Sequence, residues 1–296
     1  MSKILLIGST GQVGQELQKT LKPLGDLTCL TRQQLDLTQA AEIKKTIIAH
    51  QPDVVVNAAA YTAVDKAETD TEMAMAINAE APSVMAQAVQ EIAAQLVHIS
   101  TDYVFDGRNY TPYTEDDVTS PLGVYGKSKL LGEEGVIANC DRYIILRTAW
   151  VYGSRGHGNF VKTMLRLGAS REELKVVADQ IGTPTWSYEI AIAIANLISS
   201  NQVDSGIYHF SNSGVASWYD LAVTIFEEAA PLGFPLKVKT VLPITTAEFP
   251  TPAQRPHYSV LSKSKYSQTL GVYPPYWRNS LKQMLEEWFF LSKNSD

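Results

Sequence analysis

The stretch KILLIGSTGQVG, residues 3–14, decides the fold of this 296-residue chain. Its first five residues, Lys3–Ile7, form an apolar run that is typical of a strand buried on both faces. Gly8, Gly11 and Gly14 follow at once in a G-x-x-G-x-x-G pattern. Glycines in this place let the chain turn tightly from strand to helix and let a pyrophosphate approach the backbone N–H groups. The stretch therefore predicts the first strand and helix of a dinucleotide-binding domain.

The first half of the chain repeats this alternation of strand and helix. Further apolar runs indicate buried strands at residues 27–30, 53–57, 96–100 and 143–147. Helical patterns separate the strands, at residues 12–21, 39–50, 72–92 and 124–137. Strands that are apolar on both faces and separated by helices form a parallel sheet covered on both sides. The sequence therefore predicts a Rossmann-like α/β fold with a doubly wound parallel sheet, which binds ligands at the carboxyl ends of its strands.

After about residue 150 the alternation becomes irregular. Turn residues are dense at 153–159 and 249–256, helical patterns continue at 160–167, 189–198, 218–228 and 281–290, and a strand is predicted at 206–210. We predict an NAD(P)-binding Rossmann domain over residues 1–150 and a smaller mixed α/β substrate-binding domain over residues 151–296. Parts of residues 175–210 are candidates to join the first domain.

Composition limits the partners of the chain. Its formal net charge is −6, from 25 Lys and Arg against 31 Asp and Glu, and no basic run stands out, so we expect no nucleic-acid partner. The apolar runs are too short for a membrane span. Cys29 and Cys140 lie far apart in segments that resemble core, which favours reduced, buried cysteines. We expect a cytoplasmic protein with no membrane contact.

The end of the second predicted strand bears on the choice of cofactor. In this fold an acid at that place binds the adenosine ribose of NAD, whereas a basic residue accommodates the extra phosphate of NADP. The chain has Thr31 and Arg32 there, and its first acid is Asp36. Arg32 therefore favours NADPH, while NADH and a plain surface arginine stay open as alternatives.

Small and hydroxyl residues follow the third and fourth strands. NAAAYTAVDKAE, residues 57–68, begins with residues small enough for a flat ligand to lie against the backbone. STDYVFDG, residues 100–107, places Thr101 at the carboxyl edge of the predicted sheet, beside any nicotinamide bound there. A hydroxyl at that place can hydrogen-bond a substrate carbonyl, although Ser-Thr-Asp runs also cap loops.

Tyr125 and Lys129 lie one crossover after Thr101, in a predicted helix whose four-residue spacing puts both on one face. Reduction of a ketone creates an alkoxide that needs a proton, and a free tyrosine has a pKa of about 10. We expect the Lys129 ammonium to stabilise the phenolate and to lower the pKa of Tyr125. Thr101, Tyr125 and Lys129 are therefore the candidate catalytic residues for reduction of a carbonyl group.

Several segments carry a resemblance to a known family: GSTGQVG, NAAAYTAVDKAE, STDYVFDG, VYGKSK, RTAWVYG and PTPAQRP. Together they resemble the extended short-chain dehydrogenase/reductase superfamily and, within it, the dTDP-4-dehydrorhamnose reductases. The resemblance implies reduction, with NAD(P)H, of the 4-keto group of dTDP-4-dehydro-6-deoxy-L-mannose to give dTDP-L-rhamnose. Tyr125 would then be the proton donor, Lys129 would hold the nicotinamide ribose, and Thr101 would tune the proton transfer.

The resemblance also implies further binding residues. The cofactor would contact Gly8, Gly11, Gln12, Val13, Gly14, Arg32, Asp36, Leu37, Ala58, Ala60, Tyr61 and Thr62, together with Tyr125 and Lys129. The nucleotide-sugar substrate would contact Thr101, Asp102, Tyr103, Trp150, Asn159 and Arg255. Arg255 lies on a proline-rich, stiff loop, which suits a cation that binds a diphosphate; a surface arginine on a turn is the alternative.

Some members of this family join two subunits through magnesium held by glutamates. Glu16 in the first predicted helix and Glu287 in the last occupy similar positions. The resemblance therefore implies a homodimer with Mg²⁺ at its interface, and solvated glutamates on helix faces are the alternative.

Two other functions stay open from the sequence. A sugar-nucleotide epimerase or dehydratase shares the superfamily, but Tyr103 stands where dehydratases carry a glutamate that expels water from the sugar. A non-catalytic regulatory subunit that resembles the beta subunit of methionine adenosyltransferase would keep the cofactor cleft without the reaction. The presence of Thr101, Tyr125, Lys129 and Trp150 together favours the enzyme.

Overall fold

A parallel sheet forms the centre of the protein in a computed structural model that describes residues 2–156 and 158–293. Within these residues the sheet has six strands in the order β10-β5-β4-β3-β1-β2. The strands are β1 (Ser2–Ile7), β2 (Gly25–Leu30), β3 (Val54–Asn57), β4 (Gln95–Thr101), β5 (Tyr143–Thr148) and β10 (Gly206–His209). β2 lies on one side of β1, whereas β3, β4, β5 and β10 follow in turn on the other side, so the strand order reverses at β1. The predicted doubly wound parallel sheet is therefore confirmed.

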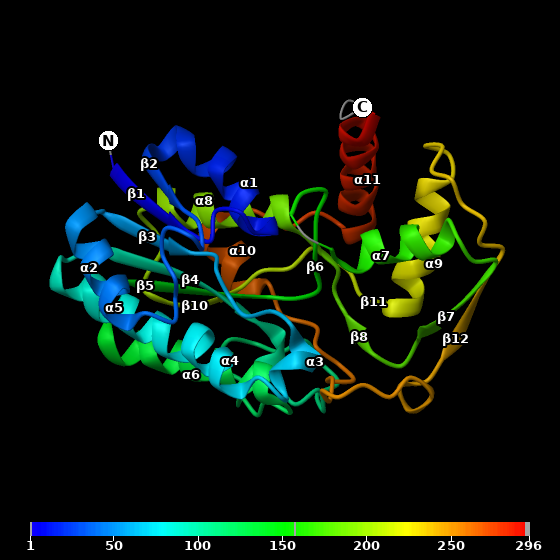
Figure 1. Ribbon diagram of the computed structural model, residues 1–296, viewed down its shortest axis with the longest axis horizontal. Coiled ribbons are helices and arrows are strands. Elements are labelled where there is room, and N and C mark those ends of the chain that lie inside the picture. Colours follow the sequence, from blue (N-terminus) through cyan, green and yellow to red (C-terminus); the bar gives the residue numbers. More distant parts are fainter. Residues whose placement is uncertain (1, 157, 294–296) are drawn as a thin grey trace.

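Helices cover both faces of the sheet, as Figure 1 shows. One face packs on α2 (Ala40–His50), α5 (Ala81–Glu91) and α6 (Val124–Asn139). The other face packs on α1 (Gln12–Leu21), α8 (Ser187–Ser199) and α10 (Ser264–Leu270). Val55 and Val56 of β3 belong to opposite cores, because successive side chains of a strand point to opposite faces. Both faces are apolar, as the continuous apolar strands predicted.

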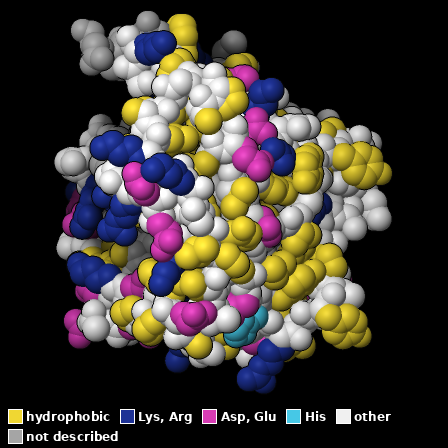
Figure 2. Space-filling model, turned by 90° about the vertical axis from the view of Figure 1, so that its right-hand side faces the viewer, with side chains coloured by type: hydrophobic (Ala, Val, Ile, Leu, Met, Phe, Trp, Pro, Cys, Tyr) yellow, Lys and Arg dark blue, Asp and Glu magenta, His cyan; other side chains and the backbone are white. Residues whose placement is uncertain are grey.

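A second, smaller part of the protein lies beyond the carboxyl ends of the strands, at the right of Figure 1. Its helices are α7 (Phe160–Gly168), α9 (Trp218–Ala229) and α11 (Trp277–Lys293). Its strands form three short pairs. These are β6 (Val151–Tyr152) with β9 (Thr185–Trp186), β7 (Glu173–Val177) with β12 (Thr240–Ile244), and β8 (Ile181–Gly182) with β11 (Ala216–Ser217). Apart from β8, these elements share an apolar core of their own. Figure 2 looks at this part from outside, where basic and acidic side chains alternate with apolar patches.

The chain passes between the two parts more than once. After the segment that forms β7, β8 and β9, it returns to the sheet as α8 and β10, and later as α10. β10 pairs with β5 and supplies the edge of the sheet. The division into domains at residue 150 stays a prediction. Residues 1 and 294–296 of the two predicted domains lie outside the described residues, as does residue 157 of the predicted turn segment.

The remaining elements are short and mostly lie close to the carboxyl ends of the strands. They are α3 (Val64–Ala67), α4 (Thr71–Met75), the π-helical turn η2 (Ala76–Glu80), and the 3₁₀ turns η1 (Lys22–Leu24), η3 (Asp102–Val104) and η4 (Thr246–Glu248). The single helix predicted over residues 72–92 is in fact divided by η2. Among the described residues, no helix combines the length and the apolar character needed to cross a membrane.

Candidate active site

A cavity of about 690 Å³ lies at the carboxyl ends of β1, β3, β4 and β5, between the sheet and the second part of the protein. Ligands of doubly wound folds bind at this edge, where the strand order changes direction. Both parts of the protein line the cavity. Most of the residues predicted to bind cofactor or substrate are among its lining: Gly8, Gly11, Gln12, Val13, Arg32, Asp36, Leu37, Ala58, Ala60, Thr62, Thr101, Asp102, Tyr103, Tyr125, Lys129, Trp150 and Asn159.

The glycine turn after β1 forms one end of the cavity. Gly8 has a φ of +81°, which favours glycine, and its N–H and that of Ser9 bond to the carbonyl of Leu30 at 3.1 and 3.2 Å. A Cβ on Gly14 would lie 2.1 Å from the Gly8 oxygen, so Gly14 allows the close packing of turn and helix rather than lining the cavity. Gly11 caps α1 without a side-chain bond. The N-terminus of α1 therefore fits a pyrophosphate.

The end of β2 has the two residues expected to contact the adenosine half of a cofactor. Arg32 is exposed at the cavity rim. The Asp36 carboxylate accepts hydrogen bonds from the N–H and the hydroxyl of Thr38 at 3.0 and 2.9 Å, and these bonds lower the pKa of Asp36. Asp36 is thus an anion that already has partners, whereas Arg32 offers a cation to a phosphate.

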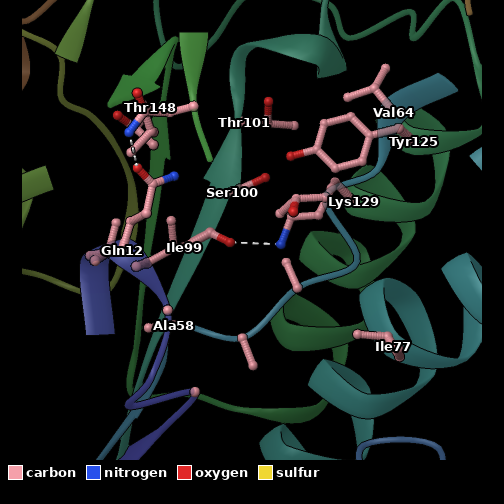
Figure 3. Close-up of a pocket in the computed structure, with 18 of the residues that line it drawn as sticks. Gln12, Ala58, Val64, Ile77, Ile99, Ser100, Thr101, Tyr125, Lys129 and Thr148 are labelled. Atoms are coloured by element: carbon pink, nitrogen blue, oxygen red, sulfur yellow. Dashed lines mark hydrogen bonds between the residues drawn. The ribbon is translucent and has the colours of Figure 1, made fainter. Parts of the chain in front are cut away.

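Thr101, Tyr125 and Lys129 come together from two elements, as Figure 3 shows. Thr101 ends β4, while Tyr125 lies in the first turn of α6. Gly126 lets this turn pack against the loop after β4, because a Cβ there would lie 2.2 Å from the Tyr103 oxygen. The Tyr125 phenol points toward the hydroxyl of Thr101 (Figure 3).

Asp102 continues this set of polar groups. The Thr101 hydroxyl donates to Asp102 Oδ1 at 3.1 Å and accepts the N–H of Tyr103 at 3.2 Å. Burial raises the pKa of Asp102 to about 6, while the hydroxyls of Ser259 and Thr101 act in the opposite direction. Asp102 Oδ2 is buried and has no hydrogen-bond partner among the described residues. Asp102 can therefore accept a hydroxyl of a substrate alongside the hydroxyls of Thr101 and Ser259.

The expected effect of Lys129 on Tyr125 is wrong in this structure. Burial raises the pKa of Tyr125 to about 12; the Thr101 hydroxyl lowers it, and the Asp102 carboxylate raises it further. Lys129 does not contribute, because its Nζ donates to the Ile99 carbonyl at 2.7 Å (dashed in Figure 3) and lies 3.1 Å from His98 Nε2. These surroundings therefore favour the protonated phenol of Tyr125 over the phenolate.

Lys129 is itself buried, with only 2% of its surface exposed. Burial lowers the pKa of Lys129 to about 8, and the Glu133 carboxylate opposes this shift. Glu133 is also buried and is bound by the guanidinium of Arg147 at 2.6 Å. Burial therefore favours the neutral amine of Lys129 more strongly than it would in an exposed lysine.

Two further hydroxyls in the cavity are not among the residues predicted from the sequence. Ser100 Oγ and Thr148 Oγ1 are buried and have no hydrogen-bond partner among the described residues. They lie at the carboxyl ends of the neighbouring strands β4 and β5, where Thr101 pairs with Thr148. The rule that led to Thr101 could have found both. Such unpartnered polar atoms are suited to hydrogen bonds with a ligand.

Aromatic side chains form the wall of the cavity that the second part contributes. Trp150 and Trp218 stack with their ring centroids 3.6 Å apart and their planes 2° apart, and Phe160 packs against Trp218. Trp150 has a φ of +46°, and its ring lies where a Cβ on Gly182 would be. Trp218 was missed in the sequence, although the capping pattern of Ser217 and Asp220 marks it as the first residue of a helix.

The two parts of the protein meet across the cavity at Gln12 and Asn159. Asn159 caps α7 and donates from Nδ2 to the Gln12 side chain at 2.7 Å. One was predicted for the cofactor and the other for the substrate, and the structure joins them to each other.

Two predicted binding residues lie outside the cavity lining, in addition to Gly14. The Tyr61 phenol donates to Asp70 at 3.0 Å, and its backbone is held by the Asn78 side chain. Arg255 donates to both carboxylate oxygens of Asp65, at 3.1 and 2.8 Å. Arg255 also interacts with Tyr103, but it is not part of the cavity lining.

The predicted magnesium ligands are engaged with cations of the chain itself. Lys19 Nζ lies 2.6 Å from the buried Glu16 and 3.6 Å from Glu287, and Arg155 approaches Glu16 at 3.6 Å. Glu287 also accepts a hydrogen bond from Ser154 at 2.6 Å. In residues 2–156 and 158–293, no three His, Cys, Asp or Glu side chains gather in a way that could hold a metal ion. Within one copy of the described residues, Glu16 and Glu287 are therefore paired with cations and do not by themselves form a Mg²⁺ site.

Known proteins are similar to this chain over nearly its whole length. The family model described as RmlD substrate binding domain matches residues 2–289. The dTDP-4-dehydrorhamnose reductase of Escherichia coli (strain K12) is 44% identical over 293 residues, which are 97% of this chain and 98% of that protein.

Solved structures are similar as well. A dTDP-4-dehydrorhamnose reductase from Clostridium acetobutylicum has a TM-score of 0.90 at 43% identity, with 96% of this chain and 99% of that one covered. The reductase from Bacillus anthracis, solved in complex with NADP, has a TM-score of 0.90 at 38% identity, with 97% and 100% covered.

Proposed function

This chain belongs to the RmlD substrate binding domain family, and from that premise we propose that it is an NADPH-dependent ketoreductase of a nucleotide sugar. The substrate we propose is dTDP-4-dehydro-6-deoxy-L-mannose, whose 4-keto group becomes the hydroxyl of dTDP-L-rhamnose. Its relatives of more than 40% identity include reductases named for that reaction. The observation that carries the proposal is the set of Thr101, Tyr125 and Lys129 beside a glycine turn at one sheet edge.

The residues of the cavity divide the reaction between them. When bound, a nicotinamide cofactor would supply the hydride that turns the ketone into an alkoxide. Tyr125 would give its proton to that oxygen, and its high pKa of about 12 keeps the proton in place until the alkoxide forms. Thr101 would hold the carbonyl oxygen, Asp102 would accept a sugar hydroxyl, and Trp150 would lie against the sugar ring.

NADPH is the cofactor we propose, because Arg32 presents an exposed cation at the end of β2. We expect Arg32→Ala to lower the ratio of kcat/KM for NADPH to that for NADH by about tenfold or more. The exposed Arg171, in the turn after α7, provides a control as Arg171→Ala. An unchanged ratio in Arg32→Ala would rule out this role of Arg32. Mg²⁺ has no place in the proposal, because Lys19 and Arg155 already neutralise Glu16.

The direct test is an assay with the purified protein. It would combine the 4-keto-6-deoxy-L-sugar nucleotide with NADPH, follow the loss of nicotinamide absorbance, and identify the product by NMR. We expect one NADPH to be oxidised for each ketone reduced. No oxidation with this substrate would sink the proposal and favour a regulatory role.

A dehydratase or epimerase is the alternative within the same fold. Tyr103 lines the cavity where dehydratases carry a glutamate, and a phenol with a raised pKa is a poorer substitute for that carboxyl group in the elimination of water. Incubation with dTDP-glucose and an oxidised cofactor distinguishes the two, since only a dehydratase would form a 4-keto sugar from it.

A further inference from the structure

His98 is a buried titratable residue to which the proposed reaction gives no part. It lies in β4 directly opposite Asn57 of β3, so both side chains point to the face of the sheet that α6 covers. His98 Nδ1 is 3.1 Å from Asn57 Nδ2, and His98 Nε2 is 3.1 Å from Lys129 Nζ. Asn57 and His98 are fully buried, so no bulk water takes part in these bonds. The three side chains form one chain of hydrogen bonds that ends at Lys129.

The direction of these hydrogen bonds is fixed at the Asn57 end. The N–H of Ala59 can only donate, and it lies 3.1 Å from Asn57 Oδ1. The Asn57 amide nitrogen, which also can only donate, is therefore the atom that faces His98 Nδ1. His98 Nδ1 must accept, so a neutral His98 carries its proton on Nε2. Burial, and then the charge of Lys129, hold the pKa of His98 well below its usual value, which keeps the ring neutral.

This tautomer points an N–H at Lys129. A neutral Lys129 amine can accept that N–H and donate to the Ile99 carbonyl, so the hydrogen-bonding groups of His98 and Ile99 that face Lys129 both have a partner. A Lys129 ammonium has no lone pair and would meet the His98 N–H donor to donor. Charging Lys129 thus requires His98 to move its proton to Nδ1, where it faces the Asn57 amide, and one buried hydrogen bond is lost.

We propose that His98, held in one tautomer by Asn57, is a positioning residue that disfavours the Lys129 ammonium. The inference rests on the proposed function and deepens it, because the charge of Lys129 affects how it binds a cofactor and how it acts on Tyr125 during the reduction. The hydrogen-bond arrangement itself does not depend on which substrate is reduced.

Other groups around Lys129 do not impose this state. On α6 itself it is faced by Tyr125 and by Glu133, whose charge favours the ammonium. From β5 comes Arg147, which binds Glu133 and so weakens that effect. From η3, Asp102 acts on Tyr125.

The acidic side chains on the helices packed against α6 do not set the charge of Lys129. Glu68 is engaged with the Val124 N–H at the start of α6. The acids of α4, η2 and α5, which are Glu72, Glu80 and Glu91, are exposed. His98 is therefore the neutral neighbour that decides between the amine and the ammonium.

The first experiment measures the tautomer directly in the intact protein without substrates. With ¹⁵N-labelled histidine, NMR distinguishes a ring nitrogen that carries a proton from one that does not, and His98→Phe assigns the signals. We expect Nε2 of His98 to carry the proton and Nδ1 to lack one. A proton on Nδ1 would overturn the proposal, and this result needs no activity and no second variant.

The second experiment reverses the tautomer. In Asn57→Asp the carboxylate accepts from both Ala59 and His98, so Nε2 becomes an acceptor for the Lys129 ammonium. We expect the titration midpoint of Lys129, followed by NMR of ¹³C-labelled lysine and assigned by Lys129→Met, to rise by about one pH unit or more. The basic limb of the pH profile of kcat/KM should move with it.

A control separates the tautomer from the added charge. In the double variant Asn57→Asp with His98→Phe, no tautomer remains to be reversed, so only the charge of Asp acts on Lys129. We expect a clearly smaller shift of the Lys129 midpoint than in Asn57→Asp alone. Equal shifts in the single and the double variant would overturn the proposal. Failure of the reduction assay with the NMR results intact would instead overturn the proposed function.

Discussion

Tyr125 shows how far a single residue is defined by its surroundings. Its position beside Thr101 could be predicted from the sequence, because both lie at ends of elements that meet at one sheet edge. The direction of its pKa could not, since it depends on burial and on a lysine whose side chain turns away to Ile99. A four-residue spacing fixes the face of a helix, but it does not fix where a long side chain ends.

Replacement of Tyr125 by phenylalanine tests its part in the reaction. Tyr125→Phe removes the proton donor and keeps the ring, so we expect kcat to fall by about 10² to 10⁴-fold. The dissociation constant of NADPH, measured by fluorescence titration, should stay near that of the wild type. Tyr110→Phe is a matched control, because Tyr110 is 91% exposed and does not line the cavity. Normal turnover of Tyr125→Phe would show that another group donates the proton.

Ionisation of the buried Asp102 carboxyl in the site affects the stability of the folded protein. Its pKa of about 6 lies above the value of 3.8 that it has when exposed, so the folded protein resists its ionisation. This cost is absent below pH of about 4, grows as the pH rises toward 6, and is fully present above 6.

We therefore expect Asp102→Asn to stabilise the protein at pH 7.5, by up to about 3 kcal/mol in the free energy of unfolding. The gain should shrink toward zero as the pH falls to about 4. Thermal unfolding at several pH values measures it, with Asp26→Asn at an exposed position as the control. A gain of equal size at every pH would show that ionisation of Asp102 is not its cause.

Among the elements, the helices and strands of the sheet could be predicted from the apolar pattern, but the π-helical turn η2 could not. Asn78 in this turn is fully buried; it accepts the N–H of Tyr61 at 2.8 Å and donates to the Tyr61 carbonyl and the Ser128 hydroxyl, both at 3.0 Å. The extra residue of the turn turns Asn78 toward these partners. It thereby holds the loop whose residues Ala60 and Thr62 line the cavity. Nothing in a pattern of apolar residues records such long-range hydrogen bonds.

Loss of this amide should loosen the loop. We expect Asn78→Ala to lower the free energy of unfolding by about 2–4 kcal/mol, because buried backbone groups of Tyr61 lose their partner. The dissociation constant of NADPH should rise as well. Ser128→Ala removes one of the three bonds of Asn78, together with the bond from the Ser128 hydroxyl to the Tyr125 carbonyl, and should cost about 1–2 kcal/mol. Denaturant unfolding of both variants measures this, and an equal loss in the two would contradict the role of Asn78.

At the scale of the whole molecule, contacts between polar side chains join the sheet and its helices to the second part around the cavity. Gln12 bonds Asn159, and Asp65 of α3 binds Arg255 from the loop after η4. The prediction that Arg255 lies on a stiff loop rested on its prolines alone. That its partner would be Asp65, 190 residues earlier in the chain, could not be predicted, because pairing over such distances depends on the complete fold.

Arg255 allows a test of substrate binding across this junction. If Arg255 exchanges Asp65 for the diphosphate of the substrate, Arg255→Ala should raise the KM of the nucleotide sugar by about tenfold or more and leave the KM of NADPH unchanged. Asp65→Asn keeps the cation and removes its partner, so its KM should rise far less. Steady-state kinetics decide the matter. An unchanged substrate KM in Arg255→Ala would end the diphosphate role.

The late return of the chain to its sheet has a consequence for synthesis of the protein. β5 pairs on one side with β4 and on the other with β10, which follows only after β6 to β9 and α8. A nascent chain that has just left the ribosome with β5 at its end therefore presents a bare strand edge and an uncovered apolar face. Translation has to pass residue 209 before that edge is closed. A stop codon placed at the apparent boundary near residue 150 would release an aggregation-prone fragment rather than an independently folded domain.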